Sequence, residues 1–216
     1  MSSFGPPKQD YSKLGSQPVA ASKPRAVEAP KKPLENPQKL QALKDVLNKS
    51  PLGALAVKFL EDRKVKVEFD EVPSQWNGKT INIDGRLSLG AAALDLVHEA
   101  RHARETLDKT TPSSKEPKDS FIAGNIREEA MATVDGIRVK DDLMAQGINV
   151  SASFPMETQY REAYNDALAK GHGSAIAEQQ AFDRVHAGFL NGEVPNGITN
   201  RPYSEFYSEE WDKQQK

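Results

Sequence analysis

The sequence predicts an α+β domain that is mainly helical, with a small antiparallel sheet and a disordered N-terminal tail. Apolar residues recur every three or four positions over most of the chain after residue 37, as in helices packed on a core. One stretch near residue 65 instead alternates apolar and polar side chains, as in a strand. Half of the 14 prolines lie within the first 37 residues, which sets that segment apart.

The chain divides into three segments by composition. Residues 1–37 carry six Lys/Arg, three Asp/Glu and few large apolar residues, so they cannot offset the entropy of ordering and are expected to be disordered. Residues 38–195 are long enough for one folded domain with its own core. Residues 196–216 are expected to form a polar and aromatic extension that lies over the surface.

Two helices are predicted at the start of the folded domain. Leu40, Leu43, Val46 and Leu47 are spaced as on one helix face. A second helix is expected over residues 50–62, with Ser50 as the N-cap and a proline directly after it in the first turn.

Two strands are expected next. Residues 65–69 alternate in polarity, and residues 80–83 form a second short apolar and polar run. Asn77-Gly78 between them is typical of a tight hairpin turn, which favours antiparallel pairing.

The rest of the domain is predicted to be helical. The strongest apolar stripe lies over residues 88–107, and a long helix is expected over 120–146, ended by Gly147. Two further helices are predicted over 157–170 and 174–190.

Composition excludes several classes of function. The formal net charge of −2 gives no basic field for nucleic acid, and the lack of cysteine excludes disulfides and thiolate metal sites. No window of about 18 apolar residues could span a membrane, and the N-terminus lacks the apolar core of a secretory signal. We expect a protein that is cytoplasmic or exported by a leaderless route.

The pattern His98-Glu99-Ala-Arg-His102 lies inside the strongest predicted helix. The two histidines are four positions apart, so they project from one face and can both bind one tetrahedral zinc ion. Glu99 lies about 100° round the helix, where it can reach a water on the metal but not the metal itself. That position suits a general base.

A catalytic zinc needs a third protein ligand and an open position for water. Glu128, Glu129 and Asp135 on the next predicted helix are the candidates, and 26 residues separate His102 from Glu129.

The order of strand pair, HExxH helix and acidic helix over residues 65–142 resembles the zincin metallopeptidases, in particular their gluzincin branch. The resemblance implies a zincin-like domain with Glu129 as the third zinc ligand, because the small Ala132 follows it at the third position. Asp135 would be the ligand in an aspzincin-like site, and Thr133 departs from the Asp or Asn of several gluzincin families. The resemblance to the zincins also implies that strand 80–83 is the edge strand of the sheet, which pairs with an extended substrate.

Zincins usually add a residue that stabilises the oxyanion. Tyr160, Tyr164 and His172 are the candidates by this resemblance. Asp95, one turn before His98, is a candidate to orient a ligand imidazole, or a plain exposed helix acid.

The sequence therefore predicts a zinc-dependent metallopeptidase that hydrolyses peptide bonds with a metal-activated water and Glu99 as general base. Its partners would be a peptide or protein substrate and, because the layout is similar to metallopeptidase domains of delivered bacterial effectors, a delivery or immunity partner. Two alternatives stay open. One is an inactive zinc-binding relative of the zincins, and the other is a non-catalytic helical interaction module in which HExxH is accidental.

Overall fold

The computed structural model describes residues 36–197 and 199–215, and over these residues the chain forms seven helices and a three-stranded sheet. This confirms the mainly helical α+β class. The predicted disordered tail, residues 1–37, lies outside the described residues except for its last two positions, which begin the first helix.

Helices α1 (Asn36–Leu47) and α2 (Pro51–Asp62) form a tight corner. The Ser50 side chain accepts a hydrogen bond from the backbone N–H of Gly53, which confirms the predicted N-cap. A Cβ on Gly53 would lie 2.4 Å from the carbonyl oxygen of Leu47, so only glycine lets the two helices approach this closely.

The sheet consists of β1 (Lys66–Asp70), β2 (Gln75–Trp76) and β3 (Thr80–Asp84), in the order β1-β3-β2. It is mixed rather than wholly antiparallel, because β3 pairs antiparallel with β2 but parallel with β1. The predicted turn at residues 77–78 joins β3 to the two-residue β2, which leaves the other side of β3 for β1. The expectation that β3 is an edge strand is therefore wrong, since β3 is central.

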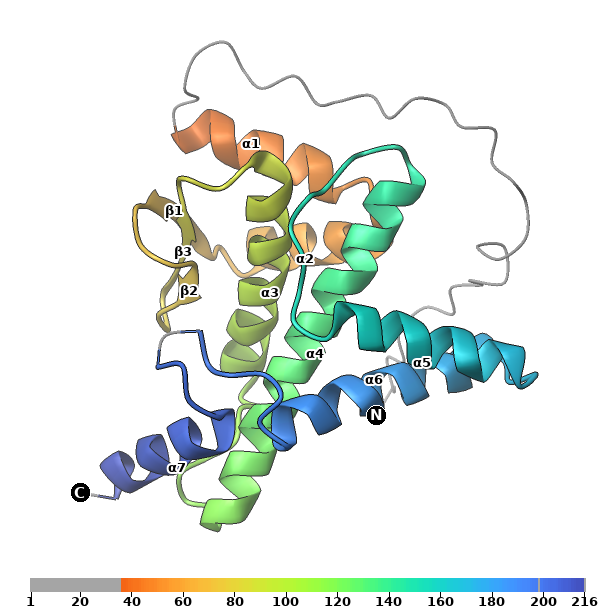
Figure 1. Cartoon of the computed structure of the whole chain (residues 1–216). Helices are drawn as coiled ribbons and strands as arrows, with labels where there is room; N and C mark the ends of the chain where they lie inside the picture. The colour runs from red at the N-terminus through yellow and green to blue at the C-terminus, as the bar shows by residue number, and fades with distance from the viewer. Residues whose placement is uncertain (1–35, 198, 216) are drawn as a thin grey trace.

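Helices α3 (Leu89–Asp108) and α4 (Lys118–Ala145) lie side by side through the middle of the molecule (Figure 1). Ser88 caps α3, with its side chain accepting from the backbone N–H of Ala91. The sheet, α1 and α2 pack around α3. In the described part of the chain, no helix is long and apolar enough to cross a membrane.

Helices α5 (Glu157–Ala169) and α6 (Ser174–Leu190) form a pair that packs on α4, and α7 (Tyr203–Gln214) packs near the start of α4 (Figure 1). The predicted surface extension over residues 196–216 is thus largely a helix. The helix packs against α4 and α6, although no residue of α7 is fully buried.

The residues that the structure describes form two apolar cores, and α4 contributes to both. The first joins α1, α2, the sheet, α3 and the C-terminal half of α4, and the second joins α4, α5 and α6 with aromatic residues of α7. Phe154 packs against both cores. The polar faces of α3 and α4 therefore meet between the two apolar cores. The candidate site lies there.

Candidate metal centre

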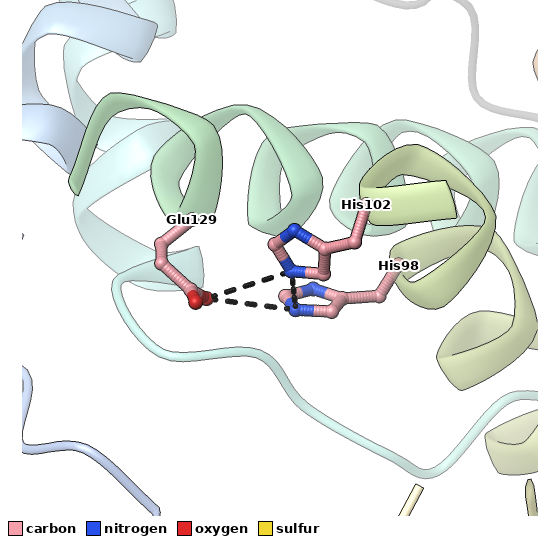
Figure 2. A group of neighbouring side chains, drawn as sticks. All are labelled: His98, His102 and Glu129. Atoms are coloured by element: carbon pink, nitrogen blue, oxygen red, sulfur yellow. Dashed lines mark hydrogen bonds and ion pairs between the residues drawn. The ribbon is translucent and has the colours of Figure 1, made fainter. Parts of the chain in front are cut away.

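Three side chains from two neighbouring helices converge on one point (Figure 2). His98 and His102 lie one turn apart on α3, and Glu129 reaches them from α4. The two histidine Nε2 atoms are 3.2 Å apart, and Oε2 of Glu129 lies 3.7 Å from Nε2 of His98 and 3.8 Å from Nε2 of His102. The structure therefore brings together the three residues predicted as ligands.

The size of this triangle suits a zinc ion. A point about 2.1 Å from all three atoms lies inside it. Zinc binds histidine nitrogen at about 2.0–2.1 Å and carboxylate oxygen at about 2.0–2.2 Å. Two imidazoles and one carboxylate are also a donor set of catalytic zinc sites, so the residues present fit this metal.

The charges within the cluster favour a cation. Burial would raise the pKa of Glu129, but the histidines and the Tyr207 hydroxyl outweigh it and lower this pKa to about 2. Burial and then His98 lower the pKa of His102 to about 4. Burial also opposes the charged form of His98, yet Glu129 raises its pKa overall. His102 is therefore neutral at neutral pH, which is the form that binds metal.

Glu99 lies beside the cluster on α3 and is only 8% exposed. Its Oε2 accepts a hydrogen bond from the backbone N–H of Trp76 at 2.7 Å. Burial raises the pKa of Glu99, while His98 and the Trp76 N–H act in the opposite direction. A carboxylate with a raised pKa is a better proton acceptor, as a general base must be.

His98 and Glu99 open into a cleft of about 350 Å³. Leu94, Phe154 and Phe189 supply apolar wall, and Tyr203 adds a hydroxyl. Asp95 also lines this cleft, where it is hydrogen-bonded to Ser74. The cluster thus borders, through His98, a cavity of mixed apolar and polar character, as ligand sites commonly do.

The alternative third ligands lie outside the cluster. Asp135 pairs with Arg101, whose Nη1 is 3.3 Å from the Asp135 Oδ2. Glu128 faces Arg101 and Glu105, and burial followed by the Glu105 charge raises its pKa to about 7. Glu129 is therefore the carboxylate of α4 that the fold presents to the histidines.

The residues expected to stabilise an oxyanion lie elsewhere. Tyr160 and Tyr164 line a separate cavity, also about 350 Å³, between α4, α5 and α6. His172 is exposed in the turn between α5 and α6. None of the three lines the cleft, because α5 packs on the part of α4 that lies beyond Glu129.

Two tyrosines of α7 that the sequence analysis did not select lie at the site. Tyr203 lines the cleft, and the Tyr207 hydroxyl donates a hydrogen bond of 2.6 Å to Oε1 of Glu129. A signal was present, because Tyr203, Phe206, Tyr207 and Trp211 recur at helical spacing. Which surface that face meets is a long-range property that the spacing does not contain.

Comparisons with protein-family models, with curated proteins and with solved structures each gave no match.

Proposed function

We propose that this protein is a zinc-dependent metallopeptidase. The convergence of His98, His102 and Glu129 beside the non-ligand carboxylate Glu99 carries the proposal. Within the described residues no fourth His, Cys, Asp or Glu joins this group. A structural zinc site usually closes its fourth position with a protein ligand, whereas a catalytic one keeps it open.

Each residue has a defined task in this proposal. Zinc held by the three ligands would polarise the scissile carbonyl and make a water acidic. Glu99 accepts the proton from that water and passes it to the leaving amine. The Trp76 N–H engages Oε2 of Glu99, which leaves Oε1 for the proton. The hydroxyl of Tyr203, in the same cleft, donates a hydrogen bond to the oxyanion.

The walls of the cleft support a peptide substrate. Ala152, Phe154 and Pro155 offer accessible apolar surface in the cleft beside the candidate metal, which suits one apolar side chain next to the bond that is cut. We therefore expect cleavage beside apolar residues.

Zinc content and peptide cleavage, measured on the same purified protein, test the proposal. We expect about one zinc per chain and cleavage of a peptide library detected by mass spectrometry. His98→Ala should lose both properties, whereas Glu99→Gln should keep zinc and lose cleavage. Glu105→Gln, a carboxylate change elsewhere on α3, is the matched control and should keep both.

The two alternative functions give different results. Zinc binding without cleavage in the wild type would make the chain a non-catalytic zinc protein. Absence of zinc binding, even after incubation with the ion, would make the HExxH pattern accidental and favour an interaction module.

A further inference from the structure

We propose that Tyr207 is a positioning residue of the metal centre, which holds Glu129 so that a single carboxylate oxygen faces the ion. This inference rests on the metal centre of the proposed function. The two oxygens of Glu129 have different partners. Oε1 accepts a hydrogen bond of 2.6 Å from the Tyr207 hydroxyl, and Oε2 faces the Nε2 atoms of both histidines.

The Tyr207 ring is itself held by other aromatic rings. Phe121 of α4 meets it edge-on at 6.5 Å between ring centroids, and Tyr203 and Phe206 of α7 lie at 6.0 Å and 5.1 Å. Phe121 is buried and lies two turns before Glu129 on the same helix. The hydroxyl and the carboxylate are therefore fixed relative to one another before any ion binds, which reduces the ordering cost of binding.

Tyr207 connects α7 to the candidate metal site. The other polar attachments of α7 to α4 and the loop before it lie on the surface. Trp211 Nε1 donates to the carbonyl of Glu116 at 3.1 Å, and Lys118 pairs with Asp212 at 2.7 Å. These contacts hold the helix in place without touching the cluster.

Loss of the Tyr207 hydroxyl would leave Oε1 of Glu129 without this donor. A buried carboxylate oxygen that lacks a partner is costly, so Glu129 would turn toward other donors or offer both oxygens to the ion. Removal of a hydrogen-bonding partner behind a metal ligand typically weakens metal binding by about 10- to 100-fold.

Zinc dissociation constants, measured by competition with a chromophoric chelator, test this role. Tyr207→Phe keeps the ring and removes only the hydroxyl, and we expect it to bind zinc about 10- to 100-fold more weakly than the wild type. Trp211→Phe is the matched control, because it removes another donor from the same helix away from Glu129, and it should bind zinc like the wild type. Equal zinc affinity in Tyr207→Phe and wild type, or equal weakening in both variants, would overturn the inference.

The visible absorption of the cobalt(II)-substituted protein gives a second readout that a merely structural role would not move. Metal geometry is visible in such spectra, and we expect Tyr207→Phe to change the cobalt bands while Trp211→Phe leaves them as in the wild type. Unchanged bands in Tyr207→Phe would contradict the proposed control of Glu129. Failure of the wild type to bind either metal would overturn the inference and the metal centre together, whereas zinc binding without peptide cleavage would overturn the proposed activity alone.

Discussion

The carboxylate of Glu99 and the backbone N–H of Trp76 are joined by a hydrogen bond of 2.7 Å, which ties the candidate base on α3 to the edge strand β2. Trp76 makes a second attachment to the same helix, since its indole Nε1 donates to Oγ1 of Thr106 at 3.2 Å. The strand and the helix that carries the histidines are thus held together at the candidate site. Glu99 has a fixed position as a result, and position is a testable part of its role.

Glu99→Asp separates position from charge. Aspartate keeps the carboxylate but is one methylene shorter. It therefore cannot accept the hydrogen bond from the Trp76 backbone N–H and reach the reacting water at the same time. We expect kcat/KM for a cleaved peptide to fall about 100-fold, as misplacement by about 1 Å can cause. Zinc affinity should not change, because Glu99 is not a ligand. Steady-state kinetics of the zinc-saturated proteins measure this, and wild-type activity in Glu99→Asp would show that the Trp76 contact has no catalytic importance.

Glu128 and Glu129 are adjacent acids on α4, and only Glu129 faces the histidines. Substitutions at the two positions therefore serve as a matched test and control. Glu129→Gln should weaken zinc binding by more than about 100-fold, since loss of a partner behind a ligand alone costs up to that much. Glu128→Gln should leave zinc affinity unchanged. It should also unfold at equal or higher urea concentration than the wild type at neutral pH, because Oε1 of Glu128 is buried and has no hydrogen-bond partner among the described residues. The reverse pattern in chelator competition would make Glu128 the ligand.

Tyr203→Phe tests the proposed oxyanion donor. Loss of one such donor costs about 100- to 1000-fold in kcat, and we expect a fall of this order with little change in KM or in zinc affinity. Tyr164→Phe is the control, since Tyr164 lines the separate cavity between α4, α5 and α6. Equal kcat values for Tyr203→Phe and Tyr164→Phe would remove Tyr203 from the mechanism.

The elements that the sequence predicted well are those set by local rules. The predicted range 174–190 agrees with α6, and Ser50 caps α2 as predicted, because cap chemistry depends on residues within one turn. The sheet was harder. A two-residue strand such as β2 has no detectable alternation, so the sequence pattern predicts a turn at Asn77-Gly78 between β1 and β3, whereas that turn joins β2 to β3.

The candidate site shows the same division. His98 and His102 could be paired from sequence because a helix fixes the relation between positions four apart. Glu129 needed a resemblance to choose it from Glu128, because the rotation of α4 against α3 is decided by packing. Tyr203 and Tyr207 depend on where α7 docks, about 75 residues further along the chain, and no local pattern determines that.

Removal of metal should reveal a dependence of stability on pH. Burial and His98 lower the pKa of His102 from 6.5 to about 4, so the unfolded state binds more protons on this residue between these pH values. The contribution of His102 to the free energy of unfolding of the zinc-free protein should therefore fall as pH falls through that window, whereas Glu128, with its pKa raised to about 7, contributes in the opposite direction. Glu129, with its pKa lowered to about 2, adds a loss in the same direction as His102 below pH 4.5.

His98 acts in the opposite direction. Its pKa is raised, so its contribution is present below pH 6.5 and fades as the pH rises above that value. Urea unfolding of the zinc-free protein from pH 4 to 8 measures both slopes. We expect His102→Asn to lose less stability than the wild type as the pH falls from 6.5 to 4, and the same pH dependence in both proteins would show that His102 does not contribute to it.

Gly136→Ala tests whether packing behind the cluster holds its geometry. A Cβ at this position would lie 2.1 Å from Cζ of Phe154, and the Phe154 ring stacks on His98 with 6.5 Å between centroids and 17° between planes. We expect a net loss of about 1–3 kcal/mol in the free energy of unfolding from overpacking. Zinc affinity should fall as well, because Phe154 can make room only by moving against His98 or out of the cleft wall. Gly173→Ala, where the added Cβ would meet no atom of the other described residues within 4 Å apart from its chain neighbours, should change stability by no more than about 0.5 kcal/mol. A Gly136→Ala protein that matched wild type in urea unfolding but lost zinc affinity would place the effect in the His98 contact alone, whereas loss of stability with wild-type zinc affinity would show that the cluster does not depend on this wall.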